Sequence, residues 1–280
     1  FINQLLEEWS MQDCNPAHTP ALNKGPRKAT EPISKEEEEW LRERDYTPTK
    51  YRSLIGAMNY LAVSTRPDIS FAVGHAARFF EDARREHWIA AKRILRYLKG
   101  SRQLRLRFEK SRADPKLVQE AKNEIVGFCD SDWAGCLDTR TSTWGFVFLY
   151  GGGAITWRSK KDSAPARSSA EAEIVALDKA AREARWLRKL EQDFDLNDGS
   201  RPTTIHEDNS AAVSISAKNR ASERTKHIDV KYFAVCKDVE DGRIKVSPIA
   251  TADNVADIFT KGLERTKFEK FRDGLGLVEK

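Results

Sequence analysis

The sequence predicts an α/β protein in which a mixed five-stranded sheet flanked by helices follows a smaller helical module. Three observations support this fold class. Apolar side chains recur at helical spacing over residues 49–99, three strand-like runs lie within residues 124–159, and a long amphipathic helix over residues 168–192 precedes two further short strands. We therefore expect a helical domain over residues 1–110 and a sheet domain over residues 120–265.

The composition of the chain is that of a globular protein. Its 280 residues, 40% hydrophobic and 32% charged, suffice for one large domain or two ordinary ones. The net charge of +5 is a mild excess, so nucleic-acid binding would depend on where the cations lie. The four cysteines form no CxxC pair and no Cys/His zinc spacing, which indicates reduced intracellular thiols.

Membrane insertion and secretion find no support in the sequence. No apolar run approaches the ~18 residues of a membrane-spanning helix. The first residues lack an initiator Met and a signal-peptide pattern, which is expected of a segment of a longer polypeptide.

The helical module is expected to begin with a short amphipathic helix over residues 1–11. Residues 15–32 carry four of the ten prolines and predict an extended connector on the surface. Three apolar stripes at helical spacing follow, and Pro67 suits the first turn of the second helix. The stripes are Tyr51, Leu54, Ile55, Met58 and Leu61; Ile69, Val73, Ala76, Ala77 and Phe80; and Trp88, Ala91, Leu95 and Leu98.

The third of these helices has a basic face. Its cations are Lys92, Arg93, Arg96 and Lys99, and three arginines follow within residues 102–107, where apolar residues alternate with them as in a half-buried strand. A basic helix face is ordinarily a solvated surface, and the density of cations here equally fits contact with nucleic-acid phosphates. The sequence leaves both interpretations open.

The sheet domain follows a charged linker around residues 110–122. Strands are expected over residues 124–132, 144–150 and 154–159, with a glycine hairpin turn at residues 151–153. Ser168 or Ser169 caps the long helix. A strand over residues 203–207, helices from Asn209 and over residues 224–240, a strand over residues 244–249, and a helix from Asp253 to Lys261 complete the order. The strand after the long helix is expected to return parallel to the first by a right-handed crossover.

Two acids stand where neighbouring strands end. Asp130 follows the apolar part of the first strand, and an ionised carboxylate on a buried strand is costly unless it is paired or binds a cation. Asp208 ends the strand that is expected to lie beside the first. Exposure at a strand end is the structural alternative for both.

A third acid lies on the long helix. Glu173 precedes Leu177 by one turn on the inward apolar stripe, and an acid at a core-facing position requires a partner. Glu171 is the alternative, and it shares a surface face with Asp178 and Arg182. We therefore favour Glu173.

The fourth acid is Asp257, in the first turns of the last predicted helix. Stabilisation of the helix N-terminus is its structural alternative, although Asp253 suits that role better as an N-cap. Each acid taken singly fits a structural role, whereas Asp130, Glu173, Asp208 and Asp257 together favour a site for two Mg²⁺ ions, with Mn²⁺ as the alternative. Two-metal phosphodiester cleavage needs hard oxygen ligands around two cations ~3.5–4 Å apart.

Several motifs in this order resemble a known family. Residues 129–135 (CDSDWAG), 168–173 (SSAEAE), 208–211 (DNSA), 224–229 (RTKHID) and 256–261 (ADIFTK) resemble the ribonuclease H domain of Ty1/copia-type retrotransposon polyproteins. Residues 51–56 (YRSLIG), 65–69 (TRPDI) and 95–100 (LRYLKG) are similar to the segment that joins the polymerase of that family to its ribonuclease H. The resemblance extends over residues 1–270.

The resemblance implies a ribonuclease-H-like fold with metal-binding acids at Asp130, Glu173, Asp208 and Asp257. It implies two-metal hydrolysis of the RNA strand of RNA·DNA hybrids, with residues 1–110 as the thumb and connection segment of the reverse transcriptase. The partners would be the hybrid and the upstream polymerase portion of the same polyprotein. The location would be intracellular: the cytoplasm, the nucleus or a virus-like particle.

Two features depart from the family pattern. The chain has no Asp-Asp dipeptide, so the paired aspartates of a polymerase are missing and the chain is not expected to polymerise DNA. The sequence of residues 161–167, which leads into the long helix, matches the family pattern less closely than the other motifs.

Other polar and aromatic residues have weaker interpretations. Arg140, Thr141 and Ser142 are predicted contacts to backbone phosphates. His206 is predicted to be a packed histidine, and His227 a structural or nucleic-acid-contacting one. Trp133 and Trp144 are expected in the core or at its rim.

Two rival functions remain open at the level of sequence. One is a binding module that holds nucleic acid without cutting it, a fragment left by decay of the retrotransposon. The other is an integrase- or transposase-like DNA strand transferase on the same fold, which would act on the ends of duplex DNA. The sequence gives no prediction of oligomeric state.

Overall fold

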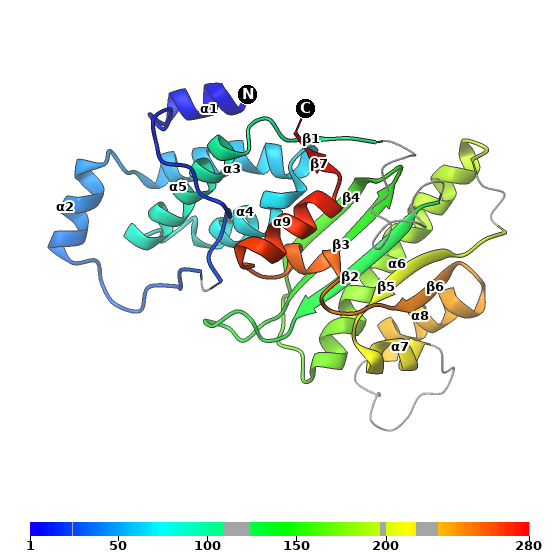
Figure 1. The fold of residues 1–280 in the computed structure, drawn as a ribbon. Coiled ribbons are helices and arrows are strands. Elements are labelled where there is room, and N and C mark those ends of the chain that lie inside the picture. The colour runs from blue at the N-terminus through cyan, green and yellow to red at the C-terminus, as the bar shows by residue number, and fades with distance from the viewer. Residues whose placement is uncertain (24, 109–123, 197–199, 217–228, 280) are drawn as a thin grey trace. The chain divides into compact units, whose positions relative to one another are not determined.

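The computed structural model describes residues 1–23, 25–108, 124–196, 200–216 and 229–279. The chain divides into two units (Figure 1). A helical unit comprises Phe1–Leu106, Lys261–Asp273 and Leu277–Lys280, and a sheet unit comprises Arg107–Thr260 and Gly274–Gly276. The C-terminal segment therefore belongs with the N-terminal helices, although it follows the sheet in sequence.

The helical unit begins with a series of helices, and helical segments lie where the three apolar stripes predicted them, over residues 48–64, 67–79 and 85–100. The helices are α1 (Ile2–Glu8), α2 (Lys35–Glu43), α3 (Pro48–Ser64), α4 (Ser70–Ala76) and α5 (Arg85–Gly100), with the 3₁₀ turns η1 (Pro67–Ile69) and η2 (Ala77–Phe79) around α4. The C-terminal helix α9 (Arg265–Gly274) leads into β7 (Leu277–Val278), which pairs antiparallel with β1 (Arg105–Leu106).

The core of the helical unit forms where the stripes meet. Tyr51, Leu54 and Met58 of α3 are fully buried, as are Ala91 and Leu95 of α5. Pro67 begins η1, as expected of a residue without an N–H at a first helical turn.

A buried ion pair lies at the centre of this unit. Arg66 donates through Nε and Nη2 to the carboxylate of Asp68, at 2.9 and 2.7 Å, and through Nη1 to the carbonyl of Ser101 at 3.1 Å. The hydroxyl of Tyr97 donates to the same carboxylate. The side chains of Arg66 and Asp68 are 2% and 0% exposed, so each charge depends on the other for compensation.

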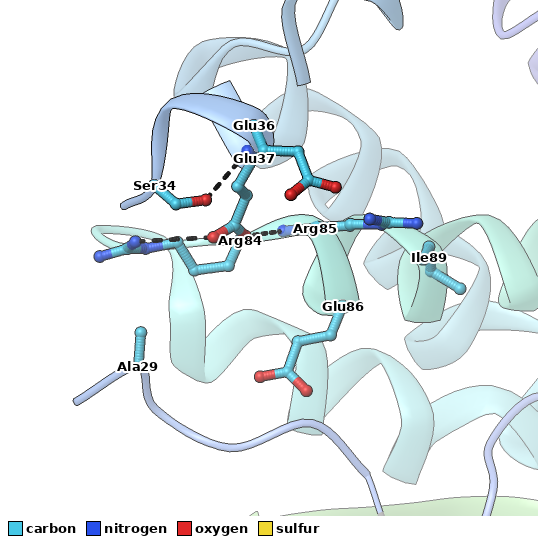
Figure 2. A pocket seen from close by; sticks show the side chains of 8 residues that line it. All are labelled: Ala29, Ser34, Glu36, Glu37, Arg84, Arg85, Glu86 and Ile89. Atoms are coloured by element: carbon cyan, nitrogen blue, oxygen red, sulfur yellow. Dashed lines mark hydrogen bonds and ion pairs between the residues drawn. The ribbon is translucent and has the colours of Figure 1, made fainter. Parts of the chain in front are cut away.

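A pocket of about 450 Å³ lies within the helical unit (Figure 2). The Glu37 carboxylate accepts a hydrogen bond from the backbone N–H of Arg85 at 2.9 Å and pairs with the Arg84 guanidinium at 4.0 Å. Charged groups that line the pocket thus pair with one another. We interpret the pocket as part of the contact between α2 and α5. The lining residues are Ala29, Ser34, Glu36, Glu37, Arg84, Arg85, Glu86 and Ile89.

The sheet unit has the predicted mixed five-stranded sheet. Its strands are β2 (Val126–Asp132), β3 (Thr143–Tyr150), β4 (Gly153–Lys161), β5 (Thr203–Glu207) and β6 (Ile244–Pro248), in the spatial order β4-β3-β2-β5-β6. β2, β3 and β4 are antiparallel, and β2, β5 and β6 are parallel. The parallel return after the long helix is confirmed, and so is the predicted mixed five-stranded sheet flanked by helices.

The helix α6 (Ser169–Asp193) packs on one face of the sheet (Figure 1). Ser168 is its N-cap and accepts a hydrogen bond from the N–H of Glu171, as predicted. The core between them is made of Cys129, Trp144, Phe146, Phe148 and Ile205 from the strands and of the apolar face of α6, joined by Val235 of α8 (Asp229–Glu240). The short helix α7 (Ser210–Ser216) follows β5.

Some predicted boundaries were wrong. The helix expected from Asp253 to Lys261 is a 3₁₀ turn, η5 (Val255–Phe259), whose N-cap is Asn254 and not Asp253. The predicted helix over residues 224–240 is described only from Asp229, since residues 217–228 lie outside the described residues. Across the described residues, no helix combines the length and the apolar character that crossing a membrane would require.

Replacing Asp68 by Asn is expected to lower the unfolding free energy of the helical unit by about 3–5 kcal/mol, because the Arg66 charge would stay buried without its counter-charge. Urea unfolding followed by tryptophan fluorescence measures the loss. Asp45→Asn is the matched control, because its ion pair with Lys50 lies in side chains that are 83% and 42% exposed, and such pairs contribute less than about 1 kcal/mol. Equal losses in the two variants would contradict the prediction.

Candidate metal centre

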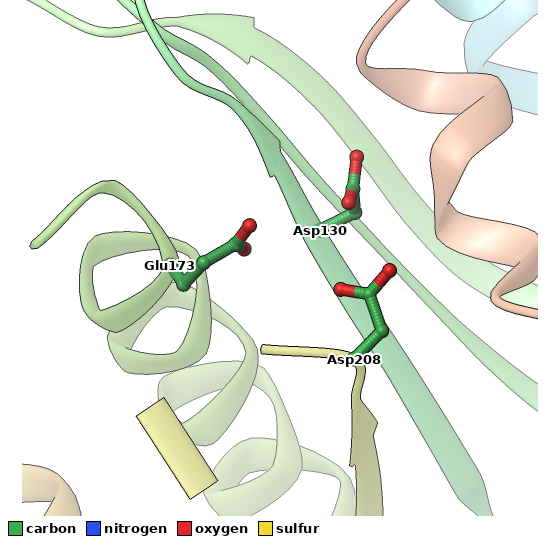
Figure 3. A group of neighbouring side chains, drawn as sticks. All are labelled: Asp130, Glu173 and Asp208. Atoms are coloured by element: carbon green, nitrogen blue, oxygen red, sulfur yellow. The ribbon is translucent and has the colours of Figure 1, made fainter. Parts of the chain in front are cut away.

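Three of the four predicted acids converge at one place in the sheet unit (Figure 3). Asp130 of β2, Glu173 of α6 and Asp208 at the end of β5 each offer a carboxylate oxygen, and these oxygens all lie within 4.8 Å of one another. Asp130 and Glu173 are 3% and 7% exposed. Asp130 and Asp208, predicted at neighbouring strands, thus lie close to Glu173 of the long helix, and their role as metal ligands stays a prediction.

The sheet itself creates the space for this cluster. The ladder between β2 and β5 ends at Phe128 and His206, so Asp130 lies two residues beyond the last pair. β5 continues only to Glu207, and the chain then passes through Asp208 into α7. Glu173, in the second turn of α6, lies beside these two aspartates (Figure 3).

Electrostatics makes the cluster costly without a counter-charge. Two negative charges at 4.8 Å repel by about 3 kcal/mol at an effective dielectric constant of about 20. Three such pairs, with Asp130 and Glu173 buried, favour a bound cation as counter-charge. Carboxylate oxygens are hard ligands of the kind that Mg²⁺ and Mn²⁺ prefer, so the donor set fits a divalent cation.

A fourth carboxyl group, which the sequence analysis did not single out, lies beside this cluster. Glu207 is fully buried, accepts a hydrogen bond from the N–H of Asn209 at 3.0 Å and another from the thiol of Cys129 at 3.2 Å. Burial raises the pKa of Glu207 to about 8, and the charges of Asp130 and Asp208 act in the same direction. The alternation of side chains along β5 could have predicted the burial of Glu207, because Ile205 and Glu207 share the core-facing side of the strand.

Asp257 is not part of the cluster. It lies on η5 and is fully buried, and the three-acid group does not include it. Its role as a fourth metal-binding acid therefore stays a prediction.

The choice between Glu171 and Glu173 has a structural basis. The Glu171 carboxylate accepts a hydrogen bond from the N–H of Arg167 at 2.6 Å, while its own N–H donates to Ser168. Glu171 thus stabilises the start of α6 in the manner of a capping box, and Glu173 is the one that reaches the cluster.

The predicted basic face of α5 holds the N-terminal connector. Arg96 Nε donates to the carbonyl of Asn15 at 2.7 Å, Lys99 Nζ to the carbonyl of Cys14 at 2.6 Å, and Arg93 Nη2 to the hydroxyl of Thr19 at 3.0 Å. Lys92 Nζ lies 5.3 Å from the ring centre of Trp88. These partners are uncharged, so the positive charges are not neutralised by them. Phosphate contact by this face stays a prediction.

The turn after β2 gives its predicted residues different surroundings. Thr141 and Ser142 are 3% and 2% exposed, and the Ser142 hydroxyl accepts a hydrogen bond from the N–H of Ala134. Arg140 is exposed. The structure thus gives Ser142 a local structural contact, and of the three only Arg140 presents its side chain at the surface.

The remaining singled-out residues are mostly structural. His206 stacks on Phe128 with ring centres 4.9 Å apart, and Trp144 is buried in the core, as predicted. Trp133 is 48% exposed, with its indole N–H donating to the carbonyl of Ala166 at 3.0 Å, which places it at the rim. His227 lies outside the described residues.

Several known proteins are similar to the chain in sequence, although no protein-family model matches it. It is 36% identical over 280 residues to the retrovirus-related Pol polyprotein from transposon TNT 1-94 of Nicotiana tabacum, which covers 99% of this chain and 20% of that polyprotein. It is 35% identical over 231 residues to the retrovirus-related Pol polyprotein from transposon RE1 of Arabidopsis thaliana, covering 82% of this chain and 15% of that polyprotein. The chain therefore spans a fifth or less of the length of these curated relatives.

Among solved structures, LC11-RNase H1, isolated from compost, is similar to part of the chain. The TM-score is 0.39 at 15% sequence identity, over 53% of this chain and 97% of that one.

Divalent cations are expected to stabilise the protein through Glu173 and not through Glu171. In Mg²⁺ the melting temperature of the wild type should rise above its value in EDTA, since a cation that binds only the folded state adds to its stability. Glu173→Gln should lose this rise. Glu171→Gln, the matched control on the same helix, should keep the rise while losing about 0.5–2 kcal/mol of stability in either buffer, as a lost cap does. Loss of the rise in Glu171→Gln alone would reverse the assignment.

Proposed function

The chain belongs to the Pol polyproteins of copia-type retrotransposons, and on this premise we propose that its sheet unit is a ribonuclease H that cleaves the RNA strand of RNA·DNA hybrids. The observation that carries the proposal is the convergence of Asp130, Glu173 and Asp208 from three separate elements. Shared divalent cations would stabilise like charges at this spacing. The strand order and directions of the sheet support the same function.

In this proposal Asp130, Glu173 and Asp208 hold the divalent cations, two Mg²⁺ or Mn²⁺ ions. Such ions, when bound, would supply activation of a water and stabilisation of the charge on the departing 3′ oxygen. The protein side chains supply the negative charge that binds the ions and the rigid elements that keep the carboxylates in place. Asp257 would serve as a fourth acid, and Glu207, whose pKa is raised by burial, lies beside the site.

The helical unit would grip the duplex and connect the sheet unit to the upstream polymerase portion of the polyprotein. Lys92, Arg93, Arg96 and Lys99 on α5, and Arg140 in the turn after β2, are the proposed phosphate contacts. Contacts to phosphates position a duplex, and hybrid is distinguished from DNA by the shape of its minor groove and its 2′-hydroxyl groups. An intracellular location is part of the same proposal.

Hydrolysis of a labelled RNA strand annealed to DNA tests the activity directly. In Mg²⁺ the wild type should cleave the RNA, and Asp130→Asn should reduce the initial rate by about 100-fold or more, because the metal's contribution to the transition state amounts to several kcal/mol. Glu171→Gln should retain cleavage. EDTA should abolish it.

The same assay separates the rival functions. If the wild type and Asp130→Asn release product at equal background rates, the chain binds nucleic acid without cutting it. If the wild type acts on the ends of duplex DNA in preference to the hybrid, it is a strand transferase. Either outcome contradicts the proposal.

The basic face of α5 is tested by salt. Lys92→Ala combined with Arg96→Ala should flatten the plot of log affinity for hybrid against log salt concentration, by about 1 in slope per phosphate contact removed. Arg182→Ala with Lys189→Ala, two exposed cations of α6, is the control for net charge and should leave the slope unchanged. Melting temperatures of both variants are needed, because Arg96 also holds the carbonyl of Asn15. An unaltered slope in the first variant would contradict phosphate contact.

A further inference from the structure

The turn η5 is attached to β2 at both of its ends, next to the metal-binding aspartate. Its N-cap, Asn254, donates from Nδ2 to the carbonyl of Cys129 at 2.8 Å, and its C-cap, Thr260, donates from Oγ1 to the Asp130 carboxylate oxygen Oδ2. Both capping side chains are fully buried. The two contacts therefore hold consecutive residues of β2, one by its backbone and one by its side chain.

A glycine in β3 makes this approach sterically possible. Gly145 is the register partner of Asp130, and a Cβ atom there would lie 2.5 Å from Cβ of Phe259 and 3.2 Å from Cγ2 of Thr260. Glycine weakens a strand interior and is expected where another backbone or group comes close. Any larger residue at position 145 would push η5 away from Asp130.

The hydroxyl of Thr260 has one proton and two acceptors within reach. Its Oγ1 lies 3.1 Å from the carbonyl of Asp257, in addition to its contact with Asp130. A hydrogen bond to an ionised carboxylate is roughly twice as strong as one between neutral groups, so the proton is directed to Asp130. This hydrogen bond restricts rotation of the carboxylate about its Cβ–Cγ bond.

From these contacts we propose that Thr260 is a positioning residue for Asp130, and that Asn254 and Gly145 keep it in place. The inference rests on the proposed function, since it concerns how one metal-binding acid is oriented. Groups that hydrogen-bond to metal-binding carboxylates set their orientation, and their loss typically weakens metal affinity or activity by 10- to 100-fold. Thr260 acts through Asp130, and it needs no contact with substrate.

Thr260→Val tests the proposal, because valine has nearly the shape of threonine and lacks the hydroxyl. Binding of Mn²⁺ alone, measured by calorimetry on the full chain, should weaken by about 10-fold or more. Thr260→Ser, which restores the hydroxyl, should return the affinity toward that of the wild type. At saturating Mg²⁺, kcat on hybrid should fall in Thr260→Val while KM for hybrid stays unchanged.

Thr203→Val is the matched control, since Thr203 is a buried threonine at the opposite end of β5 from Asp208. It should bind Mn²⁺ like the wild type. If Thr260→Val does not fold, Gly145→Ala tests the same contact from β3, and it should weaken Mn²⁺ binding while leaving the hydroxyl in the chain.

The outcomes separate the positioning role from the proposed function. Mn²⁺ binding by Thr260→Val that equals the wild type, a failure of Thr260→Ser to restore it, or an equal loss in Thr203→Val would each overturn the positioning role. In all three cases the wild type still binds Mn²⁺ and Asp130→Asn does not. If the wild type itself binds no Mn²⁺, the proposed function falls, and the positioning role falls with it.

Discussion

Mutual repulsion of three carboxylates is the constraint around which the sheet unit is built. Asp130, Glu173 and Asp208 come from positions far apart in sequence, and their oxygens lie within 4.8 Å of one another. Flexible loops would let such charges separate, because separation relieves the repulsion and increases chain entropy. Here a central strand and a long helix carry two of the acids, and the third follows directly after a paired strand. The cost of bringing the charges together is offset by the packing of those elements.

The packing of α6 explains how Glu173 reaches the cluster. Ala176, Ala180 and Ala184 recur at four-residue spacing, and all three are fully buried against the sheet. Small side chains along this stripe allow the helix axis to approach the strands closely, and close-packed interiors resist displacement. The cap at Ser168 fixes the residue at which the helix begins, and this places Glu173 in the second turn. A shift of the helix by one residue would rotate the Glu173 carboxylate away from Asp130 and Asp208.

Local periodicity was enough to predict the sheet, the long helix and the preference for Glu173, because those features depend on spacings of two and of 3.6 residues. Contacts between distant segments were not predictable in this way. Nothing in the sequence near Thr260 indicates that its hydroxyl reaches a residue 130 positions earlier. Likewise, nothing in the sequence of α5 indicates that Arg96 and Lys99 donate to the backbone carbonyls of Asn15 and Cys14. The N-cap assigned to Asp253 was wrong for a related reason: both residues suit a cap, and the contact of Asn254 with Cys129 decides between them.

Burial gives the two neighbouring acids Glu207 and Asp208 different surroundings. Glu207 and Asp208 are consecutive, yet the alternation of β5 turns Glu207 into the core while the chain turns Asp208 toward the cluster. Desolvation raises the pKa of Glu207 to about 8, so at neutral pH this carboxyl is mostly uncharged, and its contacts are a thiol and a backbone N–H. An ionised Glu207 beside Asp130 and Asp208 would add to the repulsion among these acids. Because burial raises its pKa, Glu207 adds less repulsion to the cluster than an exposed carboxylate would.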